Sequence, residues 1–354
     1  MENLAHQTME FSDKIISWYE QNKRDLPWRQ TKDPYRVWLS EIILQQTRVD
    51  QGWKYYEHFI SEYPTVEDLA RAPEAKVMKS WEGLGYYSRA RNLHASAKFI
   101  HEQLDGEFPS TYQEILKLKG VGDYTASAIS SFCFGETEAV VDGNVYRLLS
   151  RYFGVTTPID STKGKKEFKA LANEIIDRSR PDLFNQGTME FGSLQCTPTQ
   201  PNCDVCPLAQ SCFALKNDAV SKLPVKEKKL KQRSRYLDYL VLCKDDQVII
   251  NLREKKGIWQ KLNEFRLVES EAHLTEQSFV ARVSEEVPVK AFLGTSEVVK
   301  HQLSHQKLFI RFWEIEVETW PNLENSERIV DVNQLGELAF PRVIDSYLQK
   351  RAIR

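Results

Sequence analysis

The stretch "LKGVGDYTAS" (Leu118–Ser127) places two glycines around one valine, and an aspartate and a tyrosine follow directly. Gly120 and Gly122 permit positive φ and the close approach of another backbone. We expect a helix to begin near Asp123, with its first N–H groups and the positive end of its dipole facing outward. A helix, this hairpin and a second helix would form a seat for a phosphate group. An ordinary turn between two helices is the alternative.

A second polar position follows in "AVVDGNVYRLL", where an apolar segment meets the start of another predicted helix. Here Asp142 is followed by Gly143 and Asn144. A single aspartate before a glycine is often only a turn or N-cap residue, and that interpretation stays open for this stretch alone. Its place downstream of the glycine hairpin is what makes Asp142 a candidate site residue.

The stretch "CTPTQPNCDVCPLAQSC" contains four cysteines in a C-x6-C-x2-C-x5-C pattern, which are Cys196, Cys203, Cys206 and Cys212. Four thiolates within 17 residues suit a [4Fe–4S] cluster. Zinc is the alternative, although zinc sites more often use two C-x2-C pairs separated by a longer segment. The remaining cysteines, Cys133 and Cys243, stand alone in apolar segments and are interpreted as core residues.

Composition indicates a soluble globular chain. Its 354 residues suffice for two domains, with 41% hydrophobic and 28% charged residues. We see no apolar run long enough to span a membrane and no secretion signal, so we expect a cytoplasmic protein, associated with the nucleoid if bacterial. The net charge of −2 excludes a strongly basic nucleic-acid binder. Contacts with DNA would have to come from local clusters and backbone amides.

Apolar periodicity and charge composition divide the chain into three predicted segments. Residues 1–215 have helical apolar periodicity and are expected to form a mostly helical domain. Residues 216–235 contain eight basic and two acidic residues and are interpreted as a linker. Residues 236–354 contain "YLDYLVLCKDDQVIINLRE" and "HQLSHQKLFIRFWEIEVE", each of which predicts a pair of strands in a smaller α+β domain, with clear alternation in "LFIRFWEIEV".

Taken together, the glycine hairpin, Asp142 and the cysteine loop resemble the helix-hairpin-helix DNA glycosylases that carry an iron–sulfur loop, a superfamily that includes endonuclease III and the MutY adenine glycosylases. The resemblance covers roughly residues 10–215. It implies an all-α pair of subdomains with the active site in the cleft between them. The segments "LPWR", "WLSEIILQQTRV", "GLGYYSRARNL" and "MEFG" are similar to the MutY family in particular. Residues 236–354 would then be the Nudix-like domain of that family.

The residue after the hairpin separates the members of this superfamily. Endonuclease III has a lysine there, which forms a Schiff base and gives lyase activity. This chain has Tyr124, and a phenol cannot form an imine with a sugar aldehyde. MutY members are similar in lacking the lysine, so the resemblance implies base removal without strand cleavage.

The resemblance also implies roles for named residues. Glu41, set among apolar neighbours that raise a carboxyl pKa, would protonate adenine N7. Asp142 would stay ionised and stabilise the oxocarbenium ion, with Tyr124 and Asn144 beside it. The implied adenine pocket consists of Arg24, Trp28, Arg29 and Glu190. The implied DNA-binding and wedge residues are Gln46, Thr47, Leu84, Tyr86, Gly120, Val121 and Gly122.

In the C-terminal segment, "HQLSHQKLFI" resembles a Phe-Ser-His motif of the family, with Leu303 in place of phenylalanine and with Ser304 and His305 aligned. Guanine N7 accepts a hydrogen bond, whereas N7 of 8-oxoguanine carries a hydrogen and donates. The Ser304 hydroxyl could accept from that donor. The alternative is a strand with ordinary polar residues. We find no Nudix-type glutamate box, so triphosphate hydrolysis is not expected.

The sequence thus predicts a monomeric, monofunctional adenine DNA glycosylase of base excision repair that acts on A:8-oxoG or A:G mispairs in double-stranded DNA and carries a [4Fe–4S] cluster. One alternative is an endonuclease III-like glycosylase and lyase for oxidised pyrimidines. Another is a lesion-binding protein without activity. Tyr124 argues against the first alternative, and the Glu41–Asp142 pair argues against the second.

Overall fold

The structure is a computed structural model that describes residues 2–227, 232–324 and 326–351. Of the linker expected at 216–235, residues 228–231 lie outside the described residues.

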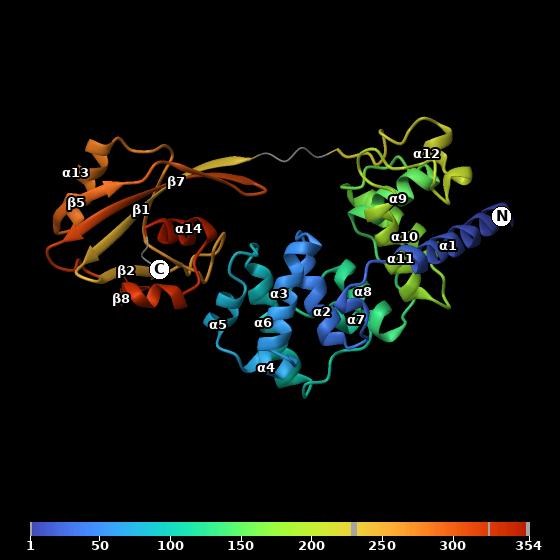
Figure 1. The fold of residues 1–354 in the computed structure, drawn as a ribbon, viewed down its shortest axis with the longest axis horizontal. Helices are drawn as coiled ribbons and strands as arrows, with labels where there is room; N and C mark the ends of the chain where they lie inside the picture. The colour runs from blue at the N-terminus through green and yellow to red at the C-terminus, as the bar shows by residue number, and fades with distance from the viewer. Residues whose placement is uncertain (1, 228–231, 325, 352–354) are drawn as a thin grey trace. The chain divides into compact units, whose positions relative to one another are not determined.

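The chain divides into two compact units, and the division does not follow the order of the sequence (Figure 1). The first unit takes Met1–Arg71 and Asn92–Lys228, and the second takes Ala72–Arg91 and Lys229–Arg354. A segment of 20 residues from the helical part of the chain therefore belongs with the C-terminal sheet.

The regular secondary structure of the first unit's described residues is all helical, as the apolar periodicity predicts. Helix α6 begins in the second unit and continues into the first. The helices are α1 (Glu2–Asn22), α2 (Pro34–Leu44), α3 (Val49–Glu62), α4 (Val66–Arg71), α6 (Ser88–Gln103), α7 (Tyr112–Ile115), α8 (Asp123–Phe134), α9 (Gly143–Phe153), α10 (Thr162–Ile175), α11 (Pro181–Leu194) and α12 (Phe213–Lys216), with short 3-10 turns η1 (Pro27–Arg29) and η2 (Ala209–Ser211).

The long periodic stretch after Pro34 forms two helices rather than one. Asp33 caps α2 by accepting a hydrogen bond from the Tyr35 N–H at 2.9 Å, and Pro34 occupies the first helical turn. The helix ends at Leu44, and Gln46 has a φ of 54°, in the left-handed region that ends a helix. Gln46 is therefore exposed at a corner between α2 and α3.

The glycine hairpin has the predicted form, since α8 begins at Asp123. Gly120 has a φ of 81°, and a Cβ there would lie 2.6 Å from the Asn92 Cβ. The Ser96 hydroxyl donates to the Lys119 carbonyl at 3.1 Å. Helix α6 thus supports the hairpin through contacts that leave no room for a side chain at residue 120.

Helices α1, α9, α10 and α11 share one hydrophobic core and lie together in Figure 1. Phe11 of α1 packs on Tyr152 of α9 with ring centroids 4.7 Å apart, and on Phe184 of α11 at 6.3 Å. Three cysteines of the loop, Cys196, Cys206 and Cys212, pack against the same core. The core therefore connects the start of α9, where Asp142 lies, with the cysteine loop.

The second unit is built on a mixed sheet whose path is β3-β2-β1-β7-β5, with β4 on β1, β6 on β7 and β8 on β2. Both predicted strand pairs, β1 with β2 and β6 with β7, are confirmed as antiparallel. Its elements are α5 (Glu74–Ser80), β1 (Arg233–Lys244), β2 (Gln247–Leu252), β3 (Asn263–Glu264), β4 (Arg266–Ser270), α13 (Glu276–Glu286), β5 (Val289–Thr295), β6 (Val299–Gln302), β7 (Gln306–Val317), β8 (Glu327–Asp331), η3 (Val332–Glu337) and α14 (Arg342–Lys350).

Successive residues of β7 anchor helices on opposite faces of this sheet, because neighbouring side chains of a strand point in opposite directions. Trp313 stacks on Phe279 of α13 with ring centroids 4.1 Å apart. Phe312 stacks on Tyr347 of α14 at 4.0 Å. Both faces of β7 are therefore buried, as expected for a sheet between two helices.

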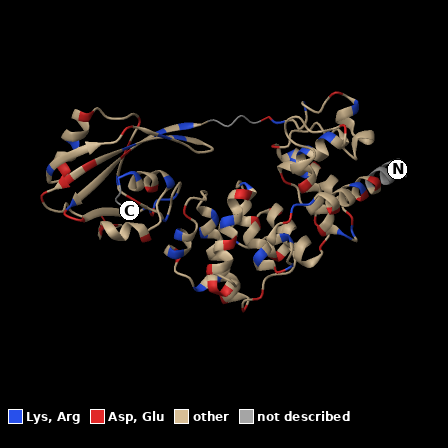
Figure 2. Cartoon of the chain, in the orientation of Figure 1, with Lys and Arg blue, Asp and Glu red and all other residues tan. Residues whose placement is uncertain are grey.

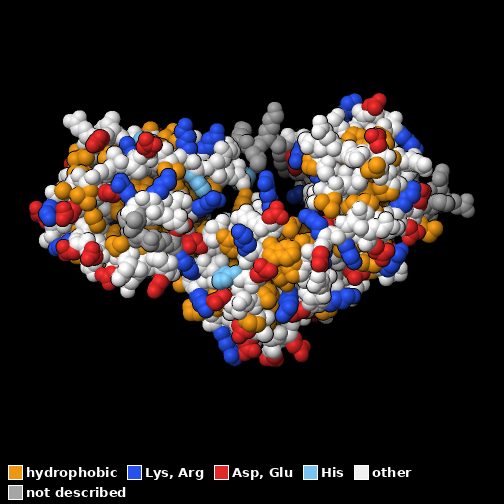
Figure 3. Space-filling view, viewed as in Figure 1, with side chains coloured by type: hydrophobic (Ala, Val, Ile, Leu, Met, Phe, Trp, Pro, Cys, Tyr) orange, Lys and Arg blue, Asp and Glu red, His pale blue; other side chains and the backbone are white. Residues whose placement is uncertain are grey.

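Charges of both signs are distributed along the helices and strands of each unit (Figure 2). On the face in Figure 3, hydrophobic side chains lie scattered among them. Among the described helices, none combines the length and the apolar character that crossing a membrane requires.

Candidate active site

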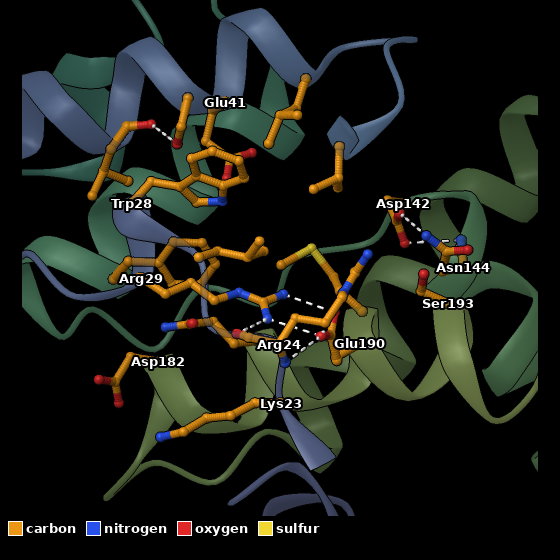
Figure 4. Close-up of a pocket in the computed structure, with 18 of the residues that line it drawn as sticks. Lys23, Arg24, Trp28, Arg29, Glu41, Asp142, Asn144, Asp182, Glu190 and Ser193 are labelled. Carbon is orange, nitrogen blue, oxygen red and sulfur yellow. Dashed lines mark hydrogen bonds and ion pairs between the residues drawn. The ribbon is translucent and has the colours of Figure 1, made fainter. Parts of the chain in front are cut away.

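One cavity of about 570 Å³ in the helical unit collects most of the polar residues that the sequence singled out (Figure 4). Glu41 reaches it from α2, and Asp142 reaches it from the start of α9. The predicted residues that line it are Arg24, Trp28, Arg29, Glu41, Thr47, Tyr124, Asp142, Asn144 and Glu190. Residues separated by up to 166 positions thus converge on one space large enough for a nucleobase.

Glu41 is a buried carboxyl group whose side chain borders the cavity, and the residue is 8% exposed. The pKa of Glu41 is raised to about 7, chiefly by burial and also by the nearby charge of Asp142, while hydrogen bonding from Tyr124 acts in the opposite direction. A carboxyl group with such a pKa can hold a proton near neutral pH and release it, which is what a general acid requires.

Tyr124 contacts the acid directly. Its hydroxyl donates to the Met189 sulfur at 3.4 Å and, as a hydrogen-bond donor near Glu41, lowers the pKa of that carboxyl group. Burial, followed by the charges of Glu41 and Asp142, raises the pKa of Tyr124 well above its usual value, so the phenol is a neutral donor. The family resemblance placed Tyr124 beside Asp142, and the structure adds the contact with Glu41.

Asp142 combines the two interpretations that the sequence left open, because it is the N-cap of α9 and also faces the cavity. One carboxylate oxygen accepts from the N–H groups of Asn144 at 2.9 Å and Val145 at 2.8 Å, and the other accepts from the Asn144 side-chain amide at 2.7 Å. Burial raises the pKa of Asp142, whereas these hydrogen bonds and the charge of Arg147 lower it. Burial therefore disfavours the ionised state that we expected for Asp142, whereas the N-terminus of α9 favours it.

Arg147 is a residue that the sequence analysis missed. Its guanidinium group donates to the Asn144 side-chain oxygen at 3.0 Å, to the Cys196 carbonyl at 2.8 Å and to the Gly192 carbonyl. Gly192 itself lies so close to Asn144 that a Cβ would approach the Asn144 carbonyl oxygen to 2.7 Å. Arg147 follows Asn144 by three residues, so helical spacing was the signal that could have identified it.

Glu190 is the third carboxylate of the cavity and differs from Glu41 in its partners. Arg24 donates to its two oxygens at 2.9 and 2.6 Å, and Arg29 donates to them at 2.9 and 2.8 Å. Although burial acts to raise it, hydrogen bonds from the two arginines lower the pKa of Glu190 to about 2. Glu190 is therefore charged at neutral pH, and of these two glutamates only Glu41 can supply a proton there.

Trp28 is largely buried and packs edge-on against Trp53 and Tyr56, with ring centroids 5.7 and 5.2 Å away. It also lines the cavity. The expected roles in packing and in base binding are therefore compatible for this residue.

The hairpin residues Gly120, Val121 and Gly122 precede α8. Its N-cap is Gly122, so the first N–H groups of that helix receive no side-chain acceptor from the cap. In the second unit, Tyr86 is 48% exposed with a φ of 46°, while Leu84 is buried.

Leu303, Ser304 and His305 form the turn between β6 and β7, closed by a hydrogen bond from the Leu303 N–H to the Gln306 carbonyl at 2.8 Å. The Ser304 hydroxyl is hydrogen-bonded with the Tyr86 hydroxyl, so two residues implied in reading DNA meet within one unit.

All four cysteines of the loop line a second, apolar cavity of about 30 Å³. Arg151 donates to the Cys196 sulfur at 3.5 Å, and the backbone near Leu208 hydrogen-bonds with Cys206. Burial and the neighbouring cysteines raise the pKa of Cys206 to about 11. Among the described residues, no group of three or more His, Cys, Asp or Glu side chains has an arrangement that could hold a metal ion.

Comparisons with known proteins assign the class first. A family model described as "HhH-GPD superfamily base excision DNA repair protein" matches residues 39–177, and a "NUDIX domain" model matches residues 238–350. A solved thermostable thymine-DNA glycosylase is 30% identical with a TM-score of 0.56, covering 60% of this chain and 99% of its own. An endonuclease III–DNA complex shares the fold, with 22% identity, a TM-score of 0.53 and coverage of 60% and 97%. The helical unit is therefore that of a base excision DNA glycosylase.

Two relatives narrow this class. The adenine DNA glycosylase of Buchnera aphidicola subsp. Schizaphis graminum is 31% identical over 96% of this chain and 98% of its own length. The human adenine DNA glycosylase is 42% identical over 58% of this chain and 39% of its own. The chain belongs to the adenine DNA glycosylase family.

Proposed function

We propose that this protein hydrolyses the N-glycosidic bond of adenine mispaired with 8-oxoguanine or guanine in double-stranded DNA. The observation that carries the proposal is the pair of buried carboxyl groups, Glu41 and Asp142, that face one cavity of nucleobase size. Membership of the adenine DNA glycosylase family supports adenine as the excised base.

Adenine must leave the duplex to reach this cavity, and extrusion costs a few kcal/mol, least at a mispair. Protonated Glu41 then donates its proton to adenine N7, and the C1′–N9 bond breaks with its electron pair going to adenine. General acid catalysis of this kind contributes about 10²–10⁴-fold to the rate. The pKa of about 7 for Glu41 makes the donor available at neutral pH.

Loss of adenine leaves an oxocarbenium ion on the sugar, and Asp142 is the carboxylate placed to stabilise it. Its hydrogen bonds from Asn144 and Val145 fix its orientation before the charge develops, so little reorganisation is needed. Water adds to C1′ and gives its proton to ionised Glu41, which restores the acid. Tyr124 cannot form a Schiff base, so the sugar–phosphate chain stays intact.

The proposed DNA contacts use both units. The outward N–H groups at the start of α8, next to Gly120, Val121 and Gly122, suit a backbone phosphate without requiring a basic surface. Gln46 and Tyr86, each exposed at a left-handed corner, suit insertion into the base stack, with Thr47 and Leu84 beside them in sequence. Ser304 is proposed to accept the N7 hydrogen of 8-oxoguanine, with Leu303 and His305 flanking it.

The four cysteines, Cys196, Cys203, Cys206 and Cys212, are proposed to hold a [4Fe–4S] cluster. All four border one apolar cavity and N–H groups point at two of the sulfurs, as is usual around iron–sulfur centres, although the four side chains as they stand are not gathered into a metal-binding arrangement. When bound, the cluster would supply a rigid link that holds the loop, and Arg147 would transmit that order to Asn144. We propose that the protein is a monomer and works in the cytoplasm, in association with the nucleoid if the cell is bacterial.

The test is a single-turnover assay on duplexes containing A:8-oxoG, A:G, T:G or thymine glycol, each with and without alkali. We expect free adenine from the first two duplexes only, with strand cleavage appearing after alkali. Glu41→Gln should abolish base release while leaving duplex binding. Release of thymine or thymine glycol, or strand cleavage with a borohydride-trapped adduct, would overturn the proposal.

A further inference from the structure

Residues 72–91 carry Leu84 and Tyr86, and the structure groups this segment with the C-terminal sheet unit rather than with the rest of the helical unit. Four polar side chains of the segment make contacts that explain the grouping. Lys79, Glu82 and Arg91 bind backbone atoms of residues 229–354. The fourth side chain, Tyr86, binds a serine hydroxyl there.

Glu82 lies at the centre of these contacts, and its side chain is 16% exposed. One of its oxygens accepts from the Phe340 N–H at 3.0 Å, and the other accepts from the Lys79 ammonium at 2.7 Å. Lys79 in turn donates to the Leu338 carbonyl at 3.1 Å. A second anchor lies at the other end of the segment, where Arg91 donates to the Gln260 carbonyl at 2.6 Å.

These anchors enclose the turn that presents Tyr86. Glu82 lies four residues before Tyr86, whose hydroxyl is hydrogen-bonded with Ser304 on the sheet. Tyr87, next to it, accepts from the Gly83 N–H at 3.1 Å and donates to the Phe340 carbonyl at 3.4 Å. Phe340 therefore contacts the segment through both its N–H and its carbonyl group, and it is fully buried.

We propose that Glu82 is a positioning residue for the choice between 8-oxoguanine and guanine opposite adenine, because it holds the Tyr86 turn in register with Ser304. The inference rests on the proposed function. A carboxylate between an ammonium group and a backbone N–H forms charge-assisted hydrogen bonds, which are the stronger kind and fix direction. Without Glu82, Tyr86 and Ser304 would no longer meet the opposite base as one rigid surface.

The test compares wild type, Glu82→Ala and Glu82→Gln in single-turnover excision at subsaturating enzyme on A:8-oxoG and A:G duplexes. We expect Glu82→Ala to lower the ratio of the two rates by about tenfold, through loss of rate on A:8-oxoG, since one partly buried charge-assisted hydrogen bond is worth about that factor. The A:G rate should stay within about twofold. Glu82→Gln keeps an acceptor for the Phe340 N–H and should recover part of the ratio.

Glu74→Ala is the matched control, an exposed carboxylate in the first turn of α5 on the same segment. It should leave the ratio unchanged. An unchanged ratio in Glu82→Ala, or an equal fall on both duplexes that follows a lower melting temperature, would overturn the inference. If Glu82→Ala does not fold, Lys79→Met tests the same contact with the Leu338 carbonyl and should lower the same ratio.

A wild-type protein that releases no adenine would contradict the proposed function instead. The inference is then tested by fluorescence anisotropy, as the ratio of affinities for uncleaved 8-oxoguanine and guanine duplexes. We expect this ratio to be lower in Glu82→Ala than in wild type, and an unchanged ratio would overturn the inference.

Discussion

The Tyr124 hydroxyl lowers the pKa of the Glu41 carboxyl group as a hydrogen-bond donor, so the residue that follows the glycine hairpin acts on the acid of the candidate site. Burial acts in the opposite direction and is the larger effect, so the pKa of Glu41 is raised to about 7. The position that holds a lysine in endonuclease III thus adjusts the acidity of a carboxyl group in this chain.

Tyr124→Phe should move the basic limb of the pH–rate profile to higher pH. The substitution keeps the ring and removes the hydroxyl, so Glu41 loses a hydrogen bond that favours its charged form and its pKa rises. Single-turnover rates on an A:G duplex between pH 5 and 9 measure the shift. Tyr112→Phe is the matched control, since its hydroxyl donates to Asp123 at 2.7 Å on the exposed side of α8. A profile that moves to lower pH would contradict this role.

Glu41→Gln should remove a pH dependence of folding stability. The pKa of Glu41 rises from 4.5 to about 7 on folding, so the folded protein binds this proton more tightly than the unfolded chain. Its contribution is fully present below about pH 4.5 and is lost as pH rises through about 7, a change of roughly 3 kcal/mol. Urea denaturation of wild type and variant at pH 5, 6, 7 and 8 measures it. Parallel stability curves for the two proteins would show that Glu41 does not titrate in this range.

Glu190→Gln should destabilise the protein by about 3 kcal/mol at pH 7, because Arg24 and Arg29 lose the carboxylate that both of them bind. The pKa of Glu190 falls from 4.5 to about 2, so its stabilising effect is present above about pH 4.5 and disappears as pH falls through about 2. The difference between variant and wild type should therefore shrink in acid. Glu67→Gln, in an exposed pair with Arg71, serves as the control and should cost less than about 1 kcal/mol.

Arg147→Met should slow excision about tenfold or more while keeping the aliphatic stem packed. Asn144 loses its guanidinium partner, and the orientation of Asp142 depends on Asn144. Arg151→Met provides the comparison, because Arg151 binds the Thr197 and Pro198 carbonyls and contacts the Cys196 sulfur. That variant should release the iron of the proposed cluster more readily, with a smaller loss of rate per iron-loaded molecule. Rates and iron content measured on the same samples separate the two effects.

Much of the local structure was predictable because it depends on short-range rules. Two glycines fix a hairpin before α8, an aspartate before a glycine caps α9, and alternating residues form β7. The break after Leu44 was not predictable from apolar periodicity, since both helices share that period and Gln46 is not a residue that demands a positive φ.

The sequence did not predict that residues 72–91 belong to the sheet unit, for a different reason. The side chains of Glu82, Lys79 and Arg91 bind backbone atoms, and any sequence supplies an N–H or a carbonyl group. The full pairing of Glu190 with two arginines was hidden as well, because the partners are more than 160 residues away along the chain.

Gly192 allows α11 to approach the start of α9 closely. A single hydrogen atom on its α-carbon separates α11 from the backbone at Asn144, and a methyl group in its place would meet the Asn144 carbonyl oxygen at 2.7 Å. An alanine there would push the first turn of α9 outward and carry Asp142 with it. The distance between the Glu41 and Asp142 carboxyl groups, where a sugar must fit, thus depends on a glycine of α11, a helix that carries neither of these two groups.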